Sequence, residues 1–184
     1  MPTKIILGFA GLLCSGKGTA AEYFKINHGA TTYRFSTILR DLLHRVYLEE
    51  SRDNMIRISE CVRHEFGEDI LSKAIAGDAA KDTNNLVIVE GIRRMTDIEH
   101  LAKLPNFILI EIFADPQKRY QRLVQRGENS DDKTKTYAQF LADHQRSTEL
   151  SILDVIKHVQ ERIDNNGDKD KLHKQLDQLL TKYQ

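Results

Sequence analysis

Residues 11–19 have the spacing G-x-x-x-x-G-K and directly follow the apolar run Ile5–Ala10. Glycines allow a turn tight enough to aim several backbone N–H groups at one anion, and the positive end of the following helix favours negative charge. A glycine turn without a ligand is the alternative, but the strand before it and the helix formers after it favour a ligand. The sequence therefore predicts a nucleotide-phosphate site formed by Gly11, Cys14, Ser15, Gly16, Lys17, Gly18 and Thr19.

Two residues are candidates for holding Mg²⁺ beside that loop. Thr19 is the first; it comes one residue later than usual, because Gly18 stands where a serine or threonine commonly follows the lysine. Glu90 is the second, at the end of the apolar run Leu86–Glu90, and ligands of parallel sheets bind at the carboxyl ends of strands. Glu90 is expected to hold a metal-bound water and Arg93 to bind phosphate, with a Glu90–Arg93 salt bridge as the alternative.

Further positive charge comes from a predicted helix that begins at Asp115-Pro116 and runs to about Gln125. Its arginines have i, i+3, i+7 spacing and precede the polar segment 127–136, which is predicted to be an exposed loop. A loop that closes over a triphosphate would bring these arginines with it and exclude water, although a solvated face is the alternative. The arginines concerned are Arg119, Arg122 and Arg126, together with Arg146 on a helix predicted over 137–150.

Composition excludes several other classes of protein. The chain has 184 residues, with 27 Lys and Arg against 27 Asp and Glu, so one domain without a global field for nucleic acid or anionic lipid is expected. Two cysteines predict neither a disulfide framework nor a zinc site, and a cytoplasmic location is expected. Cys14 is either a reactive thiol or a small residue in a tight turn. The seven histidines have no metal-ligand spacing, and a G-x-S-x-G elbow is absent from the sequence.

The elements that must position these residues alternate between strands and helices, which indicates a parallel sheet covered on both faces. The last strand is the least certain, since its residues can equally finish a helix. A leucine stripe over Lys169–Tyr183 predicts a closing amphipathic helix. The predicted strands are Ile5–Ala10, Thr31–Phe35, Leu86–Glu90, Phe107–Phe113 and His158–Ile163.

With these motifs the chain resembles the nucleoside monophosphate kinase group of P-loop proteins, including adenylate kinase, dephospho-coenzyme A kinase and phage-type deoxynucleotide kinase relatives. The resemblance implies one α/β domain over 1–184 with a three-layer P-loop NTPase fold and a five-stranded parallel sheet in the order 2-3-1-4-5. It implies a core at about 1–35, 86–126 and 137–184, a helical acceptor-binding insert at about 36–85, and a short lid at about 127–136.

The same resemblance assigns roles to single residues. Ser36 and Arg40 match the start of the acceptor site, and Glu90-Gly91-Ile92-Arg93 matches an element whose arginine binds the acceptor phosphate. Arg122 is expected against the donor adenine, with Arg126 and Arg146 reaching phosphate. Asn165 lies in a turn that resembles one near the donor base. The segment 63–70, which begins with Arg63, is similar to acceptor-domain helices of deoxynucleotide kinases.

The activity implied is Mg²⁺-dependent transfer of a phosphoryl group from ATP to a nucleoside or deoxynucleoside monophosphate. Lys17, Arg93, Arg122, Arg126 and Arg146 are the expected catalytic residues. A kinase of another small phosphorylated acceptor, such as dephospho-coenzyme A, or a non-catalytic ATP-binding regulatory module are the alternatives. Small-molecule nucleotides are the expected partners, without membrane or nucleic acid, and the protein is expected to be a monomer or homodimer.

Overall fold

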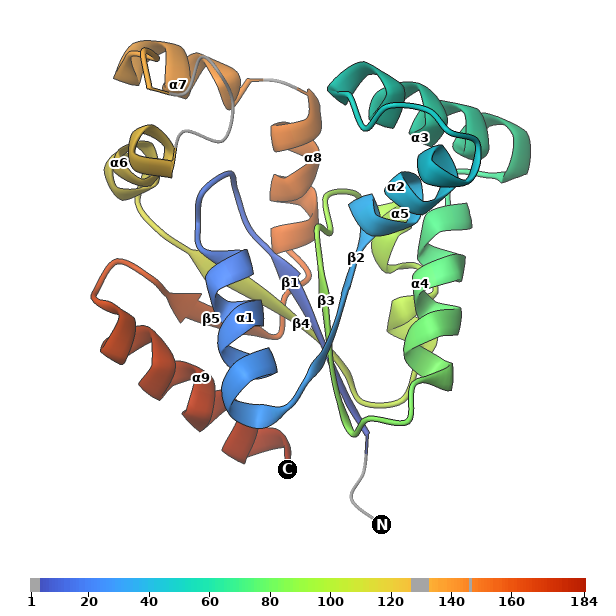
Figure 1. Cartoon of the computed structure of the whole chain (residues 1–184). Coiled ribbons are helices and arrows are strands. Elements are labelled where there is room, and N and C mark those ends of the chain that lie inside the picture. The colour runs from blue at the N-terminus through green and yellow to red at the C-terminus, as the bar shows by residue number, and fades with distance from the viewer. Residues whose placement is uncertain (1–3, 127–132, 146) are drawn as a thin grey trace.

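A five-stranded parallel sheet lies between two layers of helices in the computed structural model, which describes residues 4–126, 133–145 and 147–184 (Figure 1). The strand order is β2-β3-β1-β4-β5 with every pairing parallel, so the predicted three-layer α/β fold is confirmed. The strands are β1 (Ile5–Ala10), β2 (Thr31–Arg34), β3 (Leu86–Glu90), β4 (Phe107–Phe113) and β5 (Glu161–Asp164). The helices are α1 (Lys17–His28), α2 (Phe35–Arg45), α3 (Arg52–Phe66), α4 (Ile70–Lys81), α5 (Met95–Ile98), the 3₁₀ helix η1 (Leu101–Lys103), α6 (Pro116–Arg126), α7 (Tyr137–Asp143), α8 (Ser147–Ile156) and α9 (Lys169–Tyr183).

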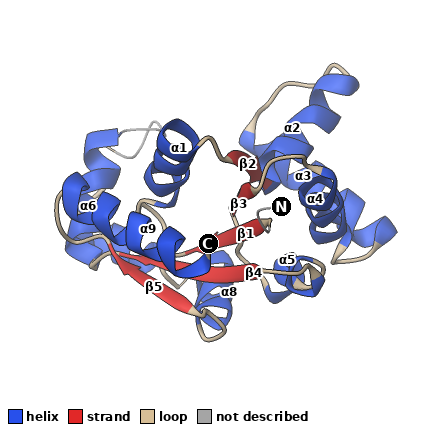
Figure 2. Cartoon of the chain, turned by 90° about the horizontal axis from the view of Figure 1, so that it is seen from below, coloured by secondary structure: helices blue, strands red, loops and turns tan. Residues whose placement is uncertain are grey.

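The two faces of the sheet are covered by different helices, as Figure 2 shows with α1 and α9 on one side and α5 and α8 on the other. Successive side chains of a strand point to opposite faces. In β1, Ile5, Leu7 and Phe9 pack with α1 and α9, whereas Ile6 and Ala10 belong to a second cluster with α2, α4, α5 and α8. Burial on both faces explains why the strands are continuously apolar in the sequence.

The closing helix α9 has the predicted bounds. Its N-cap, Asp168, accepts a hydrogen bond from the N–H of Lys171 at 2.8 Å. The leucine stripe is buried against the sheet, so the helix covers β5 and β4 through its apolar side. The stripe consists of Leu172, Leu176, Leu179 and Leu180.

Two predicted strands have different ends. β2 stops at Arg34, because Phe35 starts α2 and buries its ring in the core there. β5 begins at Glu161 rather than at His158. The N–H of His158 bonds to the carbonyl oxygen of Val155 at 3.0 Å, so the residues before β5 form the turn that ends α8. The alternative, in which this segment finishes a helix, is therefore right for its first residues.

The helix predicted over 137–150 is two helices, α7 and α8. The N–H of His144 bonds to the carbonyl oxygen of Leu141 at 3.1 Å, which tightens the end of α7. Thr136 and Gln139 form a capping box at its start. Neither glycine nor proline marks the break, so the single-helix prediction was wrong for a reason that the local sequence does not reveal.

The predicted insert is only partly separate from the core. Within 36–85, α4 places Leu71, Ile75 and Ala79 in the core, so this helix belongs to a covering layer, whereas α3 lies farther from the sheet (Figure 1). Of the predicted lid, 127–132 lie outside the described residues. Within the described ranges, no helix combines the length and apolar character that a membrane crossing needs.

Candidate active site

The loop between β1 and α1 depends on two glycines. Gly11 has φ 146°, and a Cβ there would lie 2.4 Å from the carbonyl oxygen of Ile112. Gly16, the N-cap of α1, has φ 103°, and a Cβ there would lie 2.0 Å from Asn165 Nδ2. Cys14 has φ 59°, a left-handed conformation that it adopts despite carrying a side chain. The G-x-x-x-x-G spacing is therefore required by close contacts with β4 and with the turn after β5.

Long side chains bind the carbonyl oxygens of this loop. Lys17 Nζ donates to the carbonyl oxygens of Gly11 at 2.6 Å and Leu12 at 3.1 Å. Arg119 Nη1 donates to the carbonyl oxygen of Leu13 at 3.3 Å. Arg119 is 3% exposed, so it is a structural support of the loop rather than the cleft-facing cation that its spacing predicted.

The carbonyl oxygen of Ser15 receives two further donors. Asn165 Nδ2 donates to it at 2.8 Å and Arg122 Nη1 at 3.3 Å. Arg122 Nη2 also donates to the carbonyl oxygen of Asn165 at 2.7 Å. The start of α1, the turn after β5 and α6 therefore meet at Ser15. The structure brings Arg122 and Asn165 to main-chain atoms of the loop, while their predicted contacts with the donor nucleotide stay predictions.

These bonds orient the other side of the loop. In a trans peptide the C=O of one residue and the N–H of the next point in opposite directions. The donors at the carbonyls of residues 11, 12, 13 and 15 therefore turn the N–H groups of residues 12, 13, 14 and 16 away from them. The N–H of Leu13 donates to a carboxylate oxygen, Glu149 Oε2 in α8, at 3.3 Å. At least one N–H of the loop therefore already faces an anionic group, and a row of such N–H groups can bind phosphate.

Lys17 is a poorly hydrated cation beside this loop. Its pKa is lowered from 10.5 to about 8, chiefly by burial and in addition by the positive charge of Arg93. The carboxylates of Glu149 and Glu90 act in the opposite direction. Phosphate oxygens would supply the negative charge that stabilises the protonated amine.

Glu90 lies at the end of β3, and its partner is Arg34 of β2 rather than the Arg93 of the alternative interpretation. Parallel pairing places Arg34 opposite Glu90. Arg34 Nε donates to Glu90 Oε1 at 3.0 Å, and Arg34 Nη2 donates to the same oxygen. The Glu90 side chain is 10% exposed and that of Arg34 is 49% exposed, so the pair has one buried and one open member.

The loop after β3, which carries Arg93, is held by a buried ion pair. Asp97 Oδ2 accepts the N–H groups of Arg93 at 2.9 Å and Arg94 at 3.0 Å. Asp97 Oδ1 accepts Arg63 Nη2 at 2.8 Å, and Arg63 Nη1 also donates to the carbonyl oxygen of Glu68. Arg63 is 7% exposed. Its predicted contact with an acceptor is therefore corrected: the guanidinium is occupied by Asp97 and positions the loop.

Two more predicted acceptor residues lie in α2. Arg40 Nη1 donates to Ser36 Oγ at 2.9 Å, and Arg40 Nε lies 2.9 Å from Glu50 Oε2. The Arg40 side chain is 43% exposed. Thus Ser36 and Arg40 are brought together, with a guanidinium open to solvent.

The remaining predicted residues lie at the ends of helices. Thr19 is exposed in the first turn of α1, and Arg126 is exposed in the last turn of α6. Arg146 lies outside the described residues. The three arginines of α6 therefore differ: the structure buries Arg119, places Arg122 at the loop and exposes Arg126.

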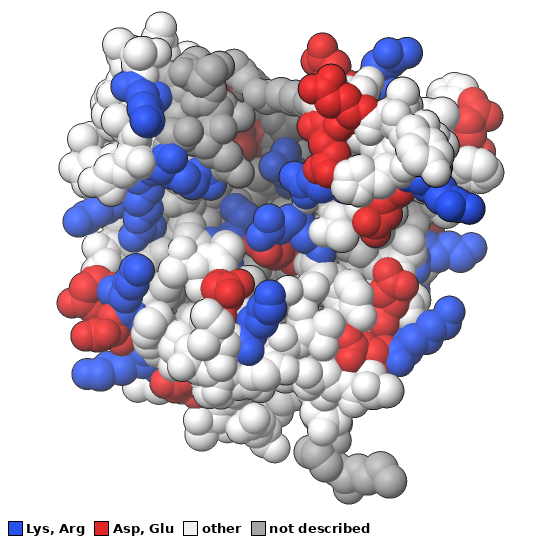
Figure 3. All heavy atoms as spheres, in the orientation of Figure 1, with Lys and Arg blue, Asp and Glu red and all other residues white. Residues whose placement is uncertain are grey.

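A cavity of about 230 Å³ lies between α1 and β2, beside Gly18 at the end of the phosphate loop. Figure 3 shows Lys and Arg side chains gathered in the hollow between the parts of the surface over α6–α7 and over α2–α3. Positive charge around a concave region favours a polyanionic ligand. The cavity is lined by Gly18, Ala21, Glu22, Lys25, Thr32, Arg34, Thr37 and Glu90.

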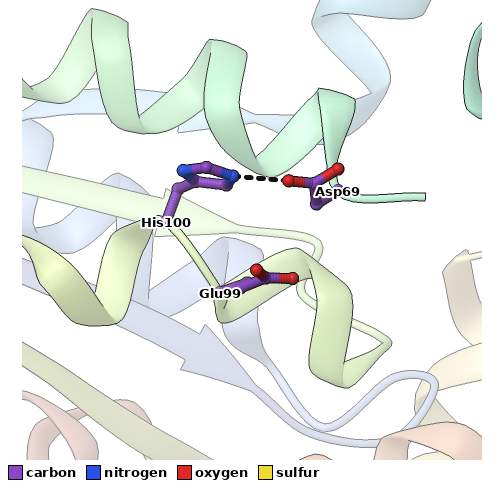
Figure 4. Close-up of side chains that lie close together, drawn as sticks. All are labelled: Asp69, Glu99 and His100. Atoms are coloured by element: carbon purple, nitrogen blue, oxygen red, sulfur yellow. Dashed lines mark hydrogen bonds and ion pairs between the residues drawn. The ribbon is translucent and has the colours of Figure 1, made fainter. Parts of the chain in front are cut away.

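A second group of polar side chains lies at the start of α4 and the end of α5 (Figure 4). Asp69, Glu99 and His100 each offer a ligand atom within 4.8 Å of the others. His100 Nε2 lies 2.6 Å from Asp69 Oδ2, and this hydrogen bond lowers the pKa of Asp69. An imidazole–carboxylate pair explains the approach of Asp69 and His100, and Glu99 is exposed.

Sequence reasoning missed three site residues, namely Arg34, Asp97 and Glu149. Arg34 ends a short polar strand, and Asp97 lies four residues beyond Arg93. Asp97 could have been predicted from the sequence, because an aspartate in the first turn of a helix commonly accepts hydrogen bonds from the N–H groups just before it. Glu149 carries no such signal, since it is 136 residues away from its partner Leu13.

A protein-family model, AAA_17, described as an AAA domain, matches residues 10–140 of this chain. The chain belongs to this AAA domain family. Among curated relatives, a UPF0200 protein of Methanothermobacter thermautotrophicus is 26% identical over 179 residues, which cover 97% of this chain and 90% of the relative. A UPF0200 protein of Hyperthermus butylicus is 26% identical over 131 residues, 71% of this chain and 70% of the relative.

Solved structures confirm the P-loop kinase fold of this AAA domain protein. TT1252 from Thermus thermophilus has a TM-score of 0.60 at 17% identity, covering 99% of both chains. Shikimate kinase from Acinetobacter baumannii, in complex with shikimate, has a TM-score of 0.58 at 13% identity, covering 98% of this chain and 95% of the other. At these identities the likeness concerns the fold, and the acceptor must be argued from this chain's own residues.

Proposed function

We propose that this AAA domain protein is an ATP-dependent kinase that transfers a phosphoryl group to the phosphate of a nucleoside or deoxynucleoside monophosphate. The observation that carries the proposal is the loop at residues 11–17, whose N–H groups are oriented by donors bound to its carbonyl oxygens. Lys17 adds a half-buried ammonium group, bonded to the carbonyl oxygens of Gly11 and Leu12. Both features favour the β- and γ-phosphates of a triphosphate.

The acceptor would lie across the cleft from the loop. Arg93 is close enough to affect the charge of Lys17, and Arg40 presents a half-exposed guanidinium from α2. Two phosphate-bearing substrates that meet there need positive charge and exclusion of water more than a strong nucleophile. In this proposal the insert at 36–85 binds the acceptor, and the lid at 127–136 closes with Arg126 and Arg146 while Arg122 supports the donor side.

The residues present fit a Mg²⁺ ion in part. Glu90 Oε2 lies 3.8 Å from the point where a side chain at Gly18 would begin, so this carboxylate faces the first turn of α1. Glu90 would hold the ion through water, and Thr19 is the nearest hydroxyl in the sequence. A bound Mg²⁺ would neutralise charge on the β- and γ-phosphates.

The test is a panel of monophosphates incubated with ATP and Mg²⁺, followed by detection of ADP. Turnover with a nucleoside or deoxynucleoside monophosphate is expected, and Lys17→Ala should abolish it while leaving the circular dichroism spectrum unchanged. An active Lys17→Ala protein would refute the assignment. Turnover only with dephospho-coenzyme A or another phosphorylated metabolite would support the other kinase class, and tight ATP binding without turnover would support a regulatory module.

A further inference from the structure

The Arg34–Glu90 pair lies at the place where the phosphate loop would need its cation. Both Arg34 bonds go to one carboxylate oxygen, Oε1 of Glu90. The other oxygen, Oε2, and Arg34 Nη2 both lie 3.8 Å from the position that a Cβ of Gly18 would occupy. The guanidinium and the carboxylate therefore face the first turn of α1 together.

Gly18 offers no side-chain ligand at this place. The residue after the lysine of a phosphate loop commonly supplies a hydroxyl ligand to Mg²⁺, and here it has no side chain. The space beside it belongs to the cavity of about 230 Å³ that Arg34 and Glu90 line. Instead of a hydroxyl oxygen, the chain places a guanidinium and a carboxylate there.

We propose that Arg34 sets how tightly this site holds its divalent cation, because the guanidinium and the cation compete for the Glu90 carboxylate. A cation that binds the Glu90 carboxylate must either share it with Arg34 or displace the guanidinium. If both stay on the carboxylate, the cation and the guanidinium lie next to each other and their positive charges repel. Arg34 then lowers metal affinity through charge and occupancy. The inference rests on the proposed nucleotide site and deepens it, since it concerns the metal that accompanies the nucleotide.

The test measures metal binding directly, without an acceptor and without turnover. Mn²⁺ is titrated into the protein with ADP, and free Mn²⁺ is followed by electron paramagnetic resonance. Arg34→Gln is expected to bind Mn²⁺ about fivefold more tightly than the unchanged protein, as for a half-exposed ion pair. Arg34→Lys, which keeps the charge but loses the two-bond geometry, is expected to fall between them.

Lys25→Gln is the matched control, because it removes the same charge from the lining of the same cavity. Lys25 is exposed, and its replacement is expected to change Mn²⁺ affinity less than twofold. In a Glu90→Gln background, Arg34→Gln is expected to have a smaller effect, because competition for the carboxylate is gone and only the repulsion between the two positive charges remains.

Equal Mn²⁺ affinity in the Arg34→Gln and unchanged proteins would overturn the inference, as would an equal gain in Lys25→Gln. Thermal melting of each variant checks that the comparison is made on folded protein. ADP affinity without metal, measured with a fluorescent analogue, separates the two proposals. Failure to bind ADP would refute the nucleotide site itself, whereas normal ADP binding with unchanged Mn²⁺ affinity would refute only the role of Arg34.

Discussion

Replacing Lys17 with methionine should remove a pH-dependent part of the stability along with nucleotide binding. The folded-state pKa of about 8 is lower than the 10.5 of an unperturbed lysine, chiefly because the ammonium group is buried. Folding therefore carries a penalty below pH 8, where Lys17 stays protonated in both states. Between pH 8 and 10.5 the unfolded chain binds more protons than the folded one, so the free energy of unfolding rises with pH.

The size of the effect follows from the shift. At about 1.4 kcal/mol per pKa unit, the full penalty is about 3 kcal/mol, and about 2 kcal/mol of it is relieved between pH 8 and 9.5. Lys17→Met lacks the titrating amine and should not show this rise. Tyr33, whose pKa burial raises to about 12, is present in both proteins, so its contribution cancels in the difference.

The assay is urea unfolding of both proteins at pH 7.5 and pH 9.5, followed by circular dichroism. The free energy of unfolding of the unchanged protein, minus that of Lys17→Met, should grow by about 2 kcal/mol across this range. A difference that stays constant with pH would show that Lys17 is well hydrated in the folded protein. The reasoning that places a desolvated cation at the loop would then be wrong.

Three further predictions concern contacts around the site. Glu149→Gln removes a carboxylate that faces Leu13 N–H and would repel ATP, so the Kd for ATP at low salt should fall about fivefold; an unchanged Kd would contradict this. Asn165→Ala removes the closer of the two donors to the Ser15 carbonyl and leaves only the longer bond from Arg122, so it should lower the free energy of unfolding by ~1 kcal/mol in urea, whereas no loss would contradict the contact. Arg63→Met leaves Asp97 buried without its cation and should lower the same quantity by ~3–5 kcal/mol, and Asp97→Asn in addition, which removes the charge but keeps an acceptor for the N–H groups of residues 93 and 94, should restore part of it; a harmless Arg63→Met would show that the pair is hydrated.

The fold was largely predictable because its signals are local. Continuous apolar runs such as residues 86–89 are typical of strands with two buried faces, and β3 has the predicted bounds. Leucine spacing located α9 in the same way. The predicted ends of elements were wrong where tertiary contacts determine them. Phe35, a residue type common in strands, is the first residue of a helix and its side chain is buried.

The site was predictable in part. Strand-end position and glycine spacing indicated the phosphate loop and Glu90, because both depend on neighbours in the sequence. Arg34 and Glu149 depend instead on which segments the fold brings together, and no spacing rule connects β2 or α8 with the loop. The resemblance predicted that Arg63 contacts a substrate. Its buried bond to Asp97 could not be foreseen, because the two residues are far apart in the sequence.

The bond between Arg63 and Asp97 also links α3 to the turn after β3. Arg63 belongs to α3, and Asp97 holds the backbone of Arg93. A rotation of α3 must either carry the 91–94 turn along or separate two opposite charges away from water. The helix and the turn are therefore mechanically coupled, so that a ligand which displaced α3 would also be expected to change the direction of Arg93.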